Sequence, residues 1–247
     1  MPAHDNLQNQ PVGVALPDWR PLVRLSRDAM VGRFCRLEPL DPGRHAGDLH
    51  AANVADTEGR MWTYLPYGPF EDLAAYRGCM EAKWLGDDPL FFAIVDAGSG
   101  RAVGVASYLR IDPANGAIEV GHLGYSPGLQ RTPAATEAMA LMMARVFALG
   151  YRRYEWKCDA LNAPSRAAAL RLGFTFEGIF RQATVVKGRN RDTAWYSILD
   201  SEWPARRAAF ERWLAPENFD AAGRQRQRLA DLTRTSENPS PRRNHGQ

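Results

Sequence analysis

The chain has 247 residues, of which 45% are hydrophobic, and its formal net charge at pH 7 is +3. This length favours one large domain, or one domain with appendages, and the apolar fraction is enough for a substantial core. No apolar run approaches the length of a membrane span, no signal-peptide pattern opens the chain, and the three cysteines lack metal-ligand spacing. We therefore expect a cytoplasmic protein without a metal site. The nearly balanced charge decides neither for nor against nucleic acid.

The composition divides the chain into an arm, a domain and a tail. Residues 1–26 are polar and interrupted by prolines, so we expect an extended or poorly ordered arm whose end is fixed by Trp19 and Leu22. Residues 27–215 form the predicted domain. Residues 216–247 are polar and arginine-rich, and we expect a tail there, with a helix over 223–234 and disorder in the last dozen residues.

The spacing of apolar residues predicts the elements of the domain. In chain order we expect a strand over 32–40, helices over 42–56 and 71–85, strands over 90–96 and 102–111, a central strand from 116, a helix over 134–149, a strand over 153–159, a helix over 162–172, a hairpin over 174–183 and 193–199, and a helix over 201–214. Val54 and Leu73 are predicted to face inward on the first two helices. Short turns join three consecutive strands at the centre, so these strands should be antiparallel.

An aromatic loop separates the first two predicted helices. Within residues 61–70 lie Trp62, Tyr64, Tyr67 and Phe70. Aromatic residues in loops often line binding sites, but rings in this position can equally cap the core. Both interpretations stay open at this point.

The centre of the chain, residues 116–136, predicts a strand, a tight loop and the start of a helix. Ile118, Val120 and Leu123 suit a half-buried strand, and its glycines indicate a bulge. Thr132 is a good helix N-cap, and Pro133 is favoured at the first helical position. Unpaired amides and the dipole at such a helix start make an anion site.

Two blocks of sequence resemble the GNAT superfamily of N-acetyltransferases. The first, Leu123-x-Tyr125-x-Pro127-x-x-Gln130-x-x-Pro133-x-Ala135, resembles that family's acetyl-coenzyme A motif, with Pro133 in place of a glycine. The second, Asn162-Ala163-Pro164-Ser165 followed by Leu172-Gly173-Phe174 and Glu177-Gly178, is similar to a signature of the RimJ/RimL-like branch, which includes acetyltransferases of ribosomal-protein N-termini. The resemblance implies an α/β (α+β) GNAT fold, in which helices flank a mixed, mostly antiparallel sheet that is splayed at its central strands.

By the same resemblance the chain uses acetyl-CoA as its acyl donor. The implied cofactor-binding residues are the strand backbone at Leu123, Gly124 and Tyr125, the loop and helix start at Gln130, Arg131, Thr132, Pro133, Ala134, Ala135 and Thr136, and Asn162 and Ser165. Because proline has no amide hydrogen, Pro133 removes one phosphate contact that the family's glycine offers.

Four side chains are candidates for moving protons. Glu119 is the first candidate base for the acceptor amine, His122 the second and Asp159 the third, and Ser165 is the candidate donor to the departing thiolate. Each also has a structural alternative: a strand carboxylate paired with arginine, a structural histidine, or an ordinary residue in the first turn of a helix. No cysteine looks like a nucleophile, so we expect direct transfer without an acyl-enzyme.

The expected reaction moves an acetyl group to a primary amine on a small molecule or a protein N-terminus. Trp62, Tyr64, Tyr67, Tyr108 and Trp195 are the candidate acceptor-binding residues. One alternative is another acyl donor, including an aminoacyl-tRNA, with phosphate contacts from tail arginines at positions 224, 226, 228, 242 and 243. Another is a non-catalytic CoA-binding module. A monomer and a homodimer are both compatible with the sequence.

Overall fold

The computed structural model describes residues 4–5 and 10–235. Eight strands form one sheet in the order β3-β4-β5-β6-β7-β8-β10-β9. Their bounds are Met30–Val31 (β3), Cys35–Pro39 (β4), Leu90–Asp96 (β5), Ala102–Asp112 (β6), Ala117–Tyr125 (β7), Arg153–Asp159 (β8), Thr175–Val186 (β9) and Arg189–Leu199 (β10). Every neighbouring pair is antiparallel except β7 and β8, which are parallel. The predicted mixed, mostly antiparallel sheet is confirmed.

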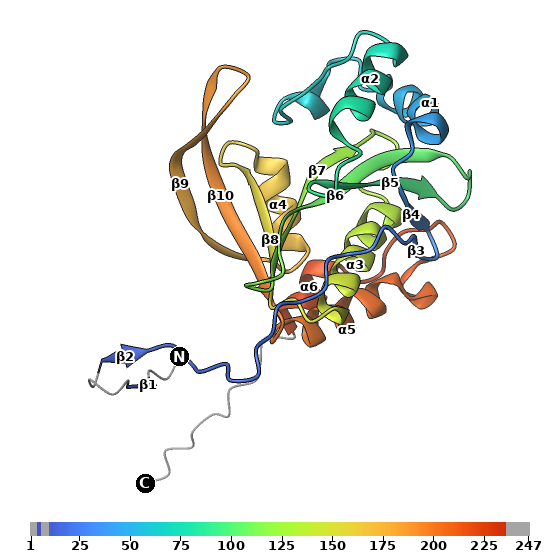
Figure 1. Cartoon of the computed structure of the whole chain (residues 1–247). Coiled ribbons are helices and arrows are strands. Elements are labelled where there is room, and N and C mark those ends of the chain that lie inside the picture. Colours follow the sequence, from blue (N-terminus) through green and yellow to red (C-terminus); the bar gives the residue numbers. More distant parts are fainter. Residues whose placement is uncertain (1–3, 6–9, 236–247) are drawn as a thin grey trace.

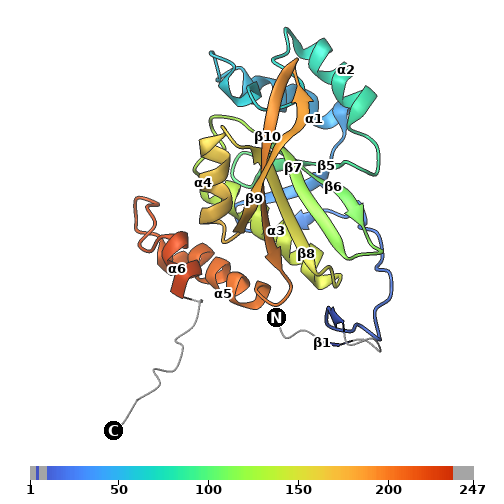
Figure 2. The same cartoon turned by 90° about the vertical axis from the view of Figure 1, so that its left-hand side faces the viewer.

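Helices cover both faces of this sheet (Figures 1 and 2). Their bounds are Pro42–Asn53 (α1), Leu73–Lys83 (α2), Pro133–Ala148 (α3), Ala163–Arg171 (α4), Trp203–Leu214 (α5) and Leu229–Thr235 (α6), with 3₁₀ turns at Arg60–Trp62 and Pro216–Asn218. One core cluster gathers under α3 and α5, and a second lies under α1 and α2. Strand β5 separates them: Phe92 and Ile94 belong to the first cluster, whereas Phe91 and Ala93 belong to the second. Successive side chains of a strand point to opposite faces, so β5 is buried on both.

Four helices begin directly after a residue whose side chain caps the helix N-terminus. Asp41, Asp72, Thr132 and Asn162 are N-caps whose side chains accept amide hydrogen bonds from the first turn. Each cap satisfies a donor that the helix leaves unpaired, which contributes about 1 kcal/mol. These caps fix the first turns of α3 and α4, the two helices that follow β7 and β8.

Buried Glu137 of α3 ties this helix to the turn between β3 and β4. Its carboxylate accepts the amides of Arg33, Phe34 and Cys35 at 2.6–2.8 Å. A Cβ atom at Gly32 would lie 2.4 Å from that carboxyl group, so the turn needs glycine here. The contact holds α3 against the far side of the sheet from α1 and α2.

Three expectations about the elements need correction. The first predicted strand is two short strands, β3 and β4, because the Glu137 contact makes a turn at residues 32–34. Val54 is 60% exposed because α1 ends at Asn53, one residue before it. Leu73 is 37% exposed, because it begins α2, and the buried face of that helix consists of Tyr76 and Met80.

The end of the N-terminal arm and the C-terminal segment both contact the domain. The indole of Trp19 donates to the carbonyl of Ala114 at 2.8 Å, and the amide of Leu22 donates to the carbonyl of Pro113 at 3.0 Å. The prediction that Trp19 and Leu22 hold the end of the arm on the domain is confirmed. In the segment expected to be a polar tail, Leu229 and Leu232 of α6 are buried in the core. The division at residue 216 stays a prediction. Residues 1–3 of the arm, residues 6–9, and the last dozen residues, including Arg242 and Arg243, lie outside the described residues.

Candidate active site

The sheet opens between β7 and β8. The two strands pair only over residues 117–120 and 153–156. Beyond these residues β7 continues paired with β6 alone, and β8 with β10 alone. The register of β7 against β6 shifts around His122, whose φ of 51° marks a bulge. Because a bulge bends its strand, the second half of β7 turns away from β8 and leaves one backbone edge unpaired. The predicted splay and bulge are confirmed.

The loop after β7 ends at the N-terminus of α3. Oγ1 of Thr132 accepts the amide of Ala135 at 3.2 Å and donates to the carbonyl of Leu129 at 2.7 Å. Pro133 is the first residue of α3, as predicted. The capped helix start therefore lies at the end of the unpaired part of β7.

Amides remain available at this helix start. Gln130 turns its side chain back, where Nε2 donates to the carbonyl of Tyr125 at 2.9 Å. Within the described residues, the amides of Arg131 and Ala134 make no hydrogen bond. With the helix dipole, these two donors form a site suited to a phosphate group. The Gln130 side chain is therefore engaged within its own loop, and the amides of Arg131 and Ala134 stay the predicted main-chain donors.

Glu119 lies on β7 beside the opening and is only 4% exposed. Its Oε2 atom is 2.5 Å from Nη1 of Arg110 and 3.0 Å from Nζ of Lys157. Lys157 also pairs with Glu155 at 2.7 Å. The arginine pairing foreseen as the structural alternative for Glu119 is thus present. Before Glu119 could take a proton from an amine, at least one of these cation contacts would have to loosen.

His122 lies in the bulge with its ring stacked on Tyr67. Its Nδ1 atom is 3.2 Å from the Tyr67 hydroxyl. Burial, with the positive charges of Arg110 and Arg191, lowers the pKa of His122 to about 4. The imidazole is therefore neutral at pH 7 and available for hydrogen bonding. A group with this pKa is a weak base toward an amine.

The remaining proton-transfer candidates lie at the ends of β8 and α4. The Asn162 side chain accepts the amide of Ser165 at 3.1 Å and so caps α4. Oγ of Ser165 accepts the indole N–H of Trp156 at 3.0 Å. Asp159 accepts the amide of Leu161 at 2.8 Å and is thereby engaged with its own loop.

The aromatic loop both packs in the core and borders the opening. Trp62 is 6% exposed in the α1–α2 cluster, where its ring meets Phe70 edge to face. Tyr64 crosses to the β8–α4 loop and donates to the carbonyl of Leu161 at 3.2 Å. Tyr67 reaches His122 on β7. Trp62 and Phe70 therefore fit the core interpretation, whereas Tyr64 and Tyr67 lie beside the opening, where acceptor binding stays a prediction.

Tyr108 corrects the sequence-based site. It is fully buried on the α3 side of the sheet, where its hydroxyl donates to the carbonyl of Met142 at 2.9 Å. Tyr108 pairs with Val120, which lies in the α3-side core, whereas Glu119 points to the other face. It belongs to the core and does not line an acceptor site. Trp195, by contrast, lies over Lys157, with the ammonium 3.7 Å from the ring centroid.

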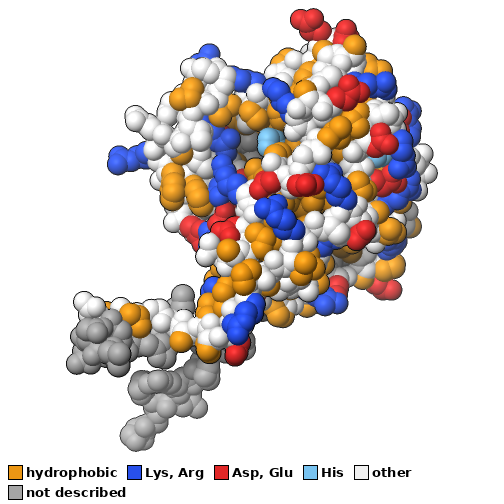
Figure 3. Space-filling view, in the orientation of Figure 1, with side chains coloured by type: hydrophobic (Ala, Val, Ile, Leu, Met, Phe, Trp, Pro, Cys, Tyr) orange, Lys and Arg blue, Asp and Glu red, His pale blue; other side chains and the backbone are white. Residues whose placement is uncertain are grey.

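The tip of the β9–β10 hairpin fastens the aromatic loop. Nζ of Lys187 donates to the carbonyls of Trp62 and Gly68, both at 2.8 Å. The hairpin and the loop thus meet on the side of the sheet that holds Glu119. Figure 3 shows a hollow beside β9 and β10, with basic side chains along one wall and histidine atoms at its floor.

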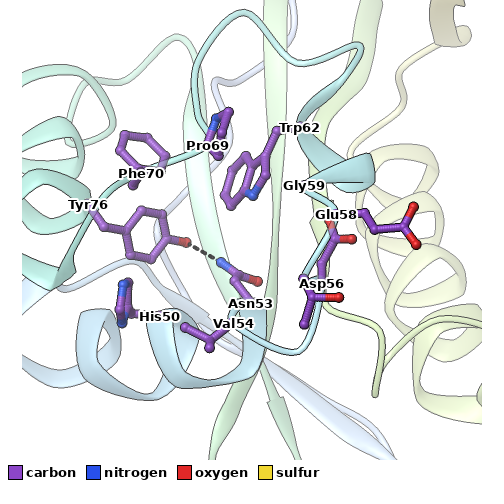
Figure 4. A pocket seen from close by; sticks show the side chains of 11 residues that line it. His50, Asn53, Val54, Asp56, Glu58, Gly59, Trp62, Pro69, Phe70 and Tyr76 are labelled. Atoms are coloured by element: carbon purple, nitrogen blue, oxygen red, sulfur yellow. Dashed lines mark hydrogen bonds between the residues drawn. The ribbon is translucent and has the colours of Figure 1, made fainter.

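A separate pocket of about 280 Å³ lies behind the aromatic loop (Figure 4). Its wall includes His50, Asn53, Trp62 and Tyr76, and Oδ1 of Asn53 has no hydrogen-bond partner. All its lining residues come from α1, α2 and the segment between them. This pocket is therefore distinct from the β7–β8 opening.

Apart from the arginine partner, sequence reasoning missed the charged side chains around Glu119, including Lys157 and the second carboxylate. Arg110, Lys157, Arg153 and Glu155 join it in one ionic cluster. Burial alone would raise the pKa of Glu155, but hydrogen bonds from Arg153 and Lys157 lower it. A sequence signal for this cluster existed. On β8 the charged residues Glu155 and Lys157 alternate with the buried residues Tyr154 and Trp156, so they share one face of the strand. Because β8 pairs with β7, that face lies beside Glu119.

A family model described as an acetyltransferase (GNAT) domain matches residues 35–175, more than half of the chain. The chain belongs to the GNAT family. The predicted resemblance is confirmed, and this GNAT protein is an acyltransferase.

Solved structures and a curated relative agree with this membership. A GCN5-related N-acetyltransferase from Brucella melitensis is 50% identical, covers 89% of this chain and all of its own, and superposes with a TM-score of 0.87. A probable GNAT-family acetyltransferase from Chromobacterium violaceum ATCC 12472 is 43% identical, covers 79% of this chain and 98% of its own, and superposes with a TM-score of 0.74. The ribosomal-protein-serine acetyltransferase of Escherichia coli (strain K12) is 31% identical over 102 residues, which span 40% of this GNAT chain and 56% of the relative. The match thus spans little more than half of that relative.

Two further observations bear on the class of site. In the described part of the chain, no helix is long and apolar enough to cross a membrane. Among the same residues, no three His, Cys, Asp or Glu side chains are grouped so that they could hold a metal ion.

Proposed function

We propose that this GNAT acyltransferase moves the acetyl group of acetyl-CoA to a primary amine by direct transfer in a ternary complex. The observation that carries the proposal is the opening after Val120 and Trp156, which exposes an edge of β7 and leads to the start of α3. An extended thioester fits along an unpaired strand edge, and its diphosphate fits a helix N-terminus. The family membership supports acetyl-CoA as the donor.

The donor would occupy the route from the bulge to α3. Amides on the backbone of Leu123, Gly124 and Tyr125 would polarise the thioester carbonyl and stabilise the oxyanion. The amides of Arg131 and Ala134 would bind the diphosphate. Thr132, Pro133, Ala135 and Thr136 would shape that helix start, and Asn162 would hold Ser165 near the sulfur.

The acceptor would approach from the face that holds Glu119. Its neutral nitrogen attacks the thioester carbonyl carbon, and the tetrahedral intermediate collapses as the carbon–sulfur bond breaks. The nitrogen loses one proton, for which we propose Glu119 as the receiving base, with neutral His122 as a hydrogen-bonding partner. The thiolate gains one proton, for which Ser165 is the proposed donor.

We propose two candidate classes of acceptor, small-molecule amines and protein N-termini. The Escherichia coli relative is a ribosomal-protein-serine acetyltransferase, which favours a protein acceptor. Tyr64, Tyr67 and Trp195 would contact either kind of acceptor, because they meet the β8–α4 loop, His122 and Lys157 at the opening. Trp62 packs in the α1–α2 core and would support Tyr67.

The test is incubation of the folded protein with acetyl-CoA and two panels, small primary amines and short peptides with free N-termini. Mass spectrometry should detect one acetyl group on the amine, with one free CoA thiol released per product. Failure across both panels, for protein that binds acetyl-CoA, would contradict the proposal and favour a CoA-binding module. Transfer only from another acyl thioester would identify a different donor.

A further inference from the structure

Arg191 on β10 has a guanidinium without a partner. Its Nε atom is buried and makes no hydrogen bond, and no carboxylate among the described residues pairs with it. The residue as a whole is half-buried, but a buried donor left without a hydrogen bond is costly, so proteins rarely leave one in this state unless a ligand or water completes it. A guanidinium binds carboxylates and phosphates especially well, because its donors match two oxygens at once.

The charge of Arg191 lies beside the opening of the sheet. It acts on His122 of β7, where burial, Arg110 and Arg191 together lower the imidazole pKa. It also acts on Cys158 of β8, where it opposes the rise in the thiol pKa that burial causes. These two residues lie on the two strands that separate. Arg191 lies two residues before Thr193, which pairs with Asp159 at the end of β8, so it stands where β7 and β8 no longer pair.

The carboxylates near Arg191 are already committed. Glu119, Glu155 and Glu177 pair with three cations, namely Arg110, Lys157 and Arg153. Asp192 accepts the amide of Gln182 at 2.7 Å and the side chain of Asn190 at 3.0 Å. Counted with Glu177, the ionic cluster contains three carboxylates and three cations, so none of these carboxylates is left without a cation.

A second donor on β10 also lacks a partner. Nε1 of Trp195 is buried without a hydrogen bond, while the ring lies between Lys157 and Phe180. Trp195 stands opposite Lys157 in the β8–β10 pairing, which places it on the Glu119 face. Two unsatisfied donors on one strand, one of them on an arginine that no described carboxylate pairs with, indicate a ligand that brings oxygen atoms and negative charge.

We propose that the acyl acceptor is an amine that also carries a carboxylate or phosphate group, and that Arg191 binds this anionic group. The proposal rests on the amine acetylation proposed above and narrows its acceptor class. Arg191 is then a specificity-determining residue: it holds the acceptor by its anion so that the amine faces the unpaired edge of β7.

The test compares matched pairs of amines that differ only in the anion. Suitable pairs are tyrosine and tyramine, β-alanine and propylamine, and phosphoethanolamine and ethanolamine, with rates expressed per concentration of free amine. The wild type should acetylate at least one anionic member with a kcat/KM about tenfold or more above its neutral partner. Arg191→Met should lower kcat/KM for that anionic member by about 10- to 100-fold and change the neutral member less than about threefold. Arg191→Lys should keep part of the preference.

The matched control is Arg189→Met, which removes an exposed arginine from the same strand and should leave the preference unchanged. Equal rates on both members of every pair would overturn the inference. An equal loss on both members in Arg191→Met, or weaker acetyl-CoA binding in that variant, would also overturn it, because Arg191 would then serve the donor.

Calorimetry of the same pairs on the CoA-loaded protein separates this inference from the proposed function. If no amine is acetylated but an anionic amine binds in an Arg191-dependent manner, the proposed function fails and the anion site stands. If acetylation occurs without an anion preference, the proposed function stands and the inference fails. If no anionic amine binds and none is acetylated, both fail.

Discussion

Glu119 and Glu155 face each other across Lys157 on neighbouring parallel strands. The side chain of Lys157 is only 5% exposed, so its charge is held by these carboxylates and by the ring of Trp195. Removing one partner from a buried ion pair is costly, because the other charge stays behind without compensation. At this scale, a loss of activity on mutating Glu119 has two explanations, proton transfer and the placement of Lys157.

Paired variants distinguish these explanations. We predict that Glu119→Gln lowers kcat by about 100-fold or more, the range of general base catalysis, whereas Glu155→Gln lowers it by less than about tenfold. Both variants remove one carboxylate from Lys157, but only Glu119 is the proposed base. Steady-state kinetics over a range of pH measures this, with thermal unfolding to verify the fold. Equal losses in the two variants would show that both carboxylates act by holding Lys157.

The burial of His122 should make the stability of the protein depend on pH, because burial lowers the pKa of its imidazole. Its pKa falls from 6.5 to about 4 on folding, so between these values the unfolded chain binds a proton that the folded protein does not. Stability attributable to His122 is therefore present above pH 6.5 and falls by about 3 kcal/mol as the pH drops to 4.

We predict that wild type loses stability more steeply than His122→Gln between pH 7 and pH 4. Urea unfolding of both proteins at several pH values measures the difference in free energy of unfolding. A difference that does not change with pH would show that the folded protein does not keep this imidazole neutral.

At the scale of elements, the loop from β7 to α3 joins a strand edge to a helix start. Arg131 in this loop has a φ of 62°, a left-handed conformation that most side chains avoid, and it is exposed. Its position immediately before the Thr132 cap sets its charge beside the proposed diphosphate site.

We predict that Arg131→Glu raises the Kd for acetyl-CoA about tenfold, because a negative charge then opposes the diphosphate. Acetyl-pantetheine lacks the diphosphate, so its use as a donor should not change. Arg189→Glu, at an exposed position of β10, is the control for the change in net charge. If Arg131→Glu binds acetyl-CoA as tightly as wild type does, the diphosphate does not bind at this helix start.

For the molecule as a whole, the C-terminal segment is part of the packed structure as far as α6. Arg206 of α5 donates to the carbonyls of Gly173 and Thr233, which links α5 to the end of α4 and to α6. Leu229 is 1% exposed within the α3-side core. Since α4 bears Ser165, packing of α6 supports one wall of the proposed site.

We therefore predict that Leu229→Ala lowers the free energy of unfolding by about 2–4 kcal/mol, the cost of deleting a buried leucine side chain. Leu170→Ala, at a half-exposed position of α4, should cost much less. Chemical denaturation measures both. A negligible effect of Leu229→Ala would mean that the segment after residue 216 behaves as the loose tail that its composition indicates.

Local sequence patterns were sufficient for the order and type of most elements, because apolar spacing, caps and turn residues act over a few neighbouring positions. Strand β5 and strand β8 have the predicted bounds, and α3 begins at Pro133 as its Thr-Pro start requires. The two motif blocks identified the family, and from it the splay between β7 and β8. Tertiary structure alone decided which side chains meet at the opening. Tyr108 lies in the core because its neighbour in the sheet is Val120, while Lys157 meets Glu119 from a strand far along the chain. Such contacts depend on strand register and on the path of the sheet, which no local pattern encodes.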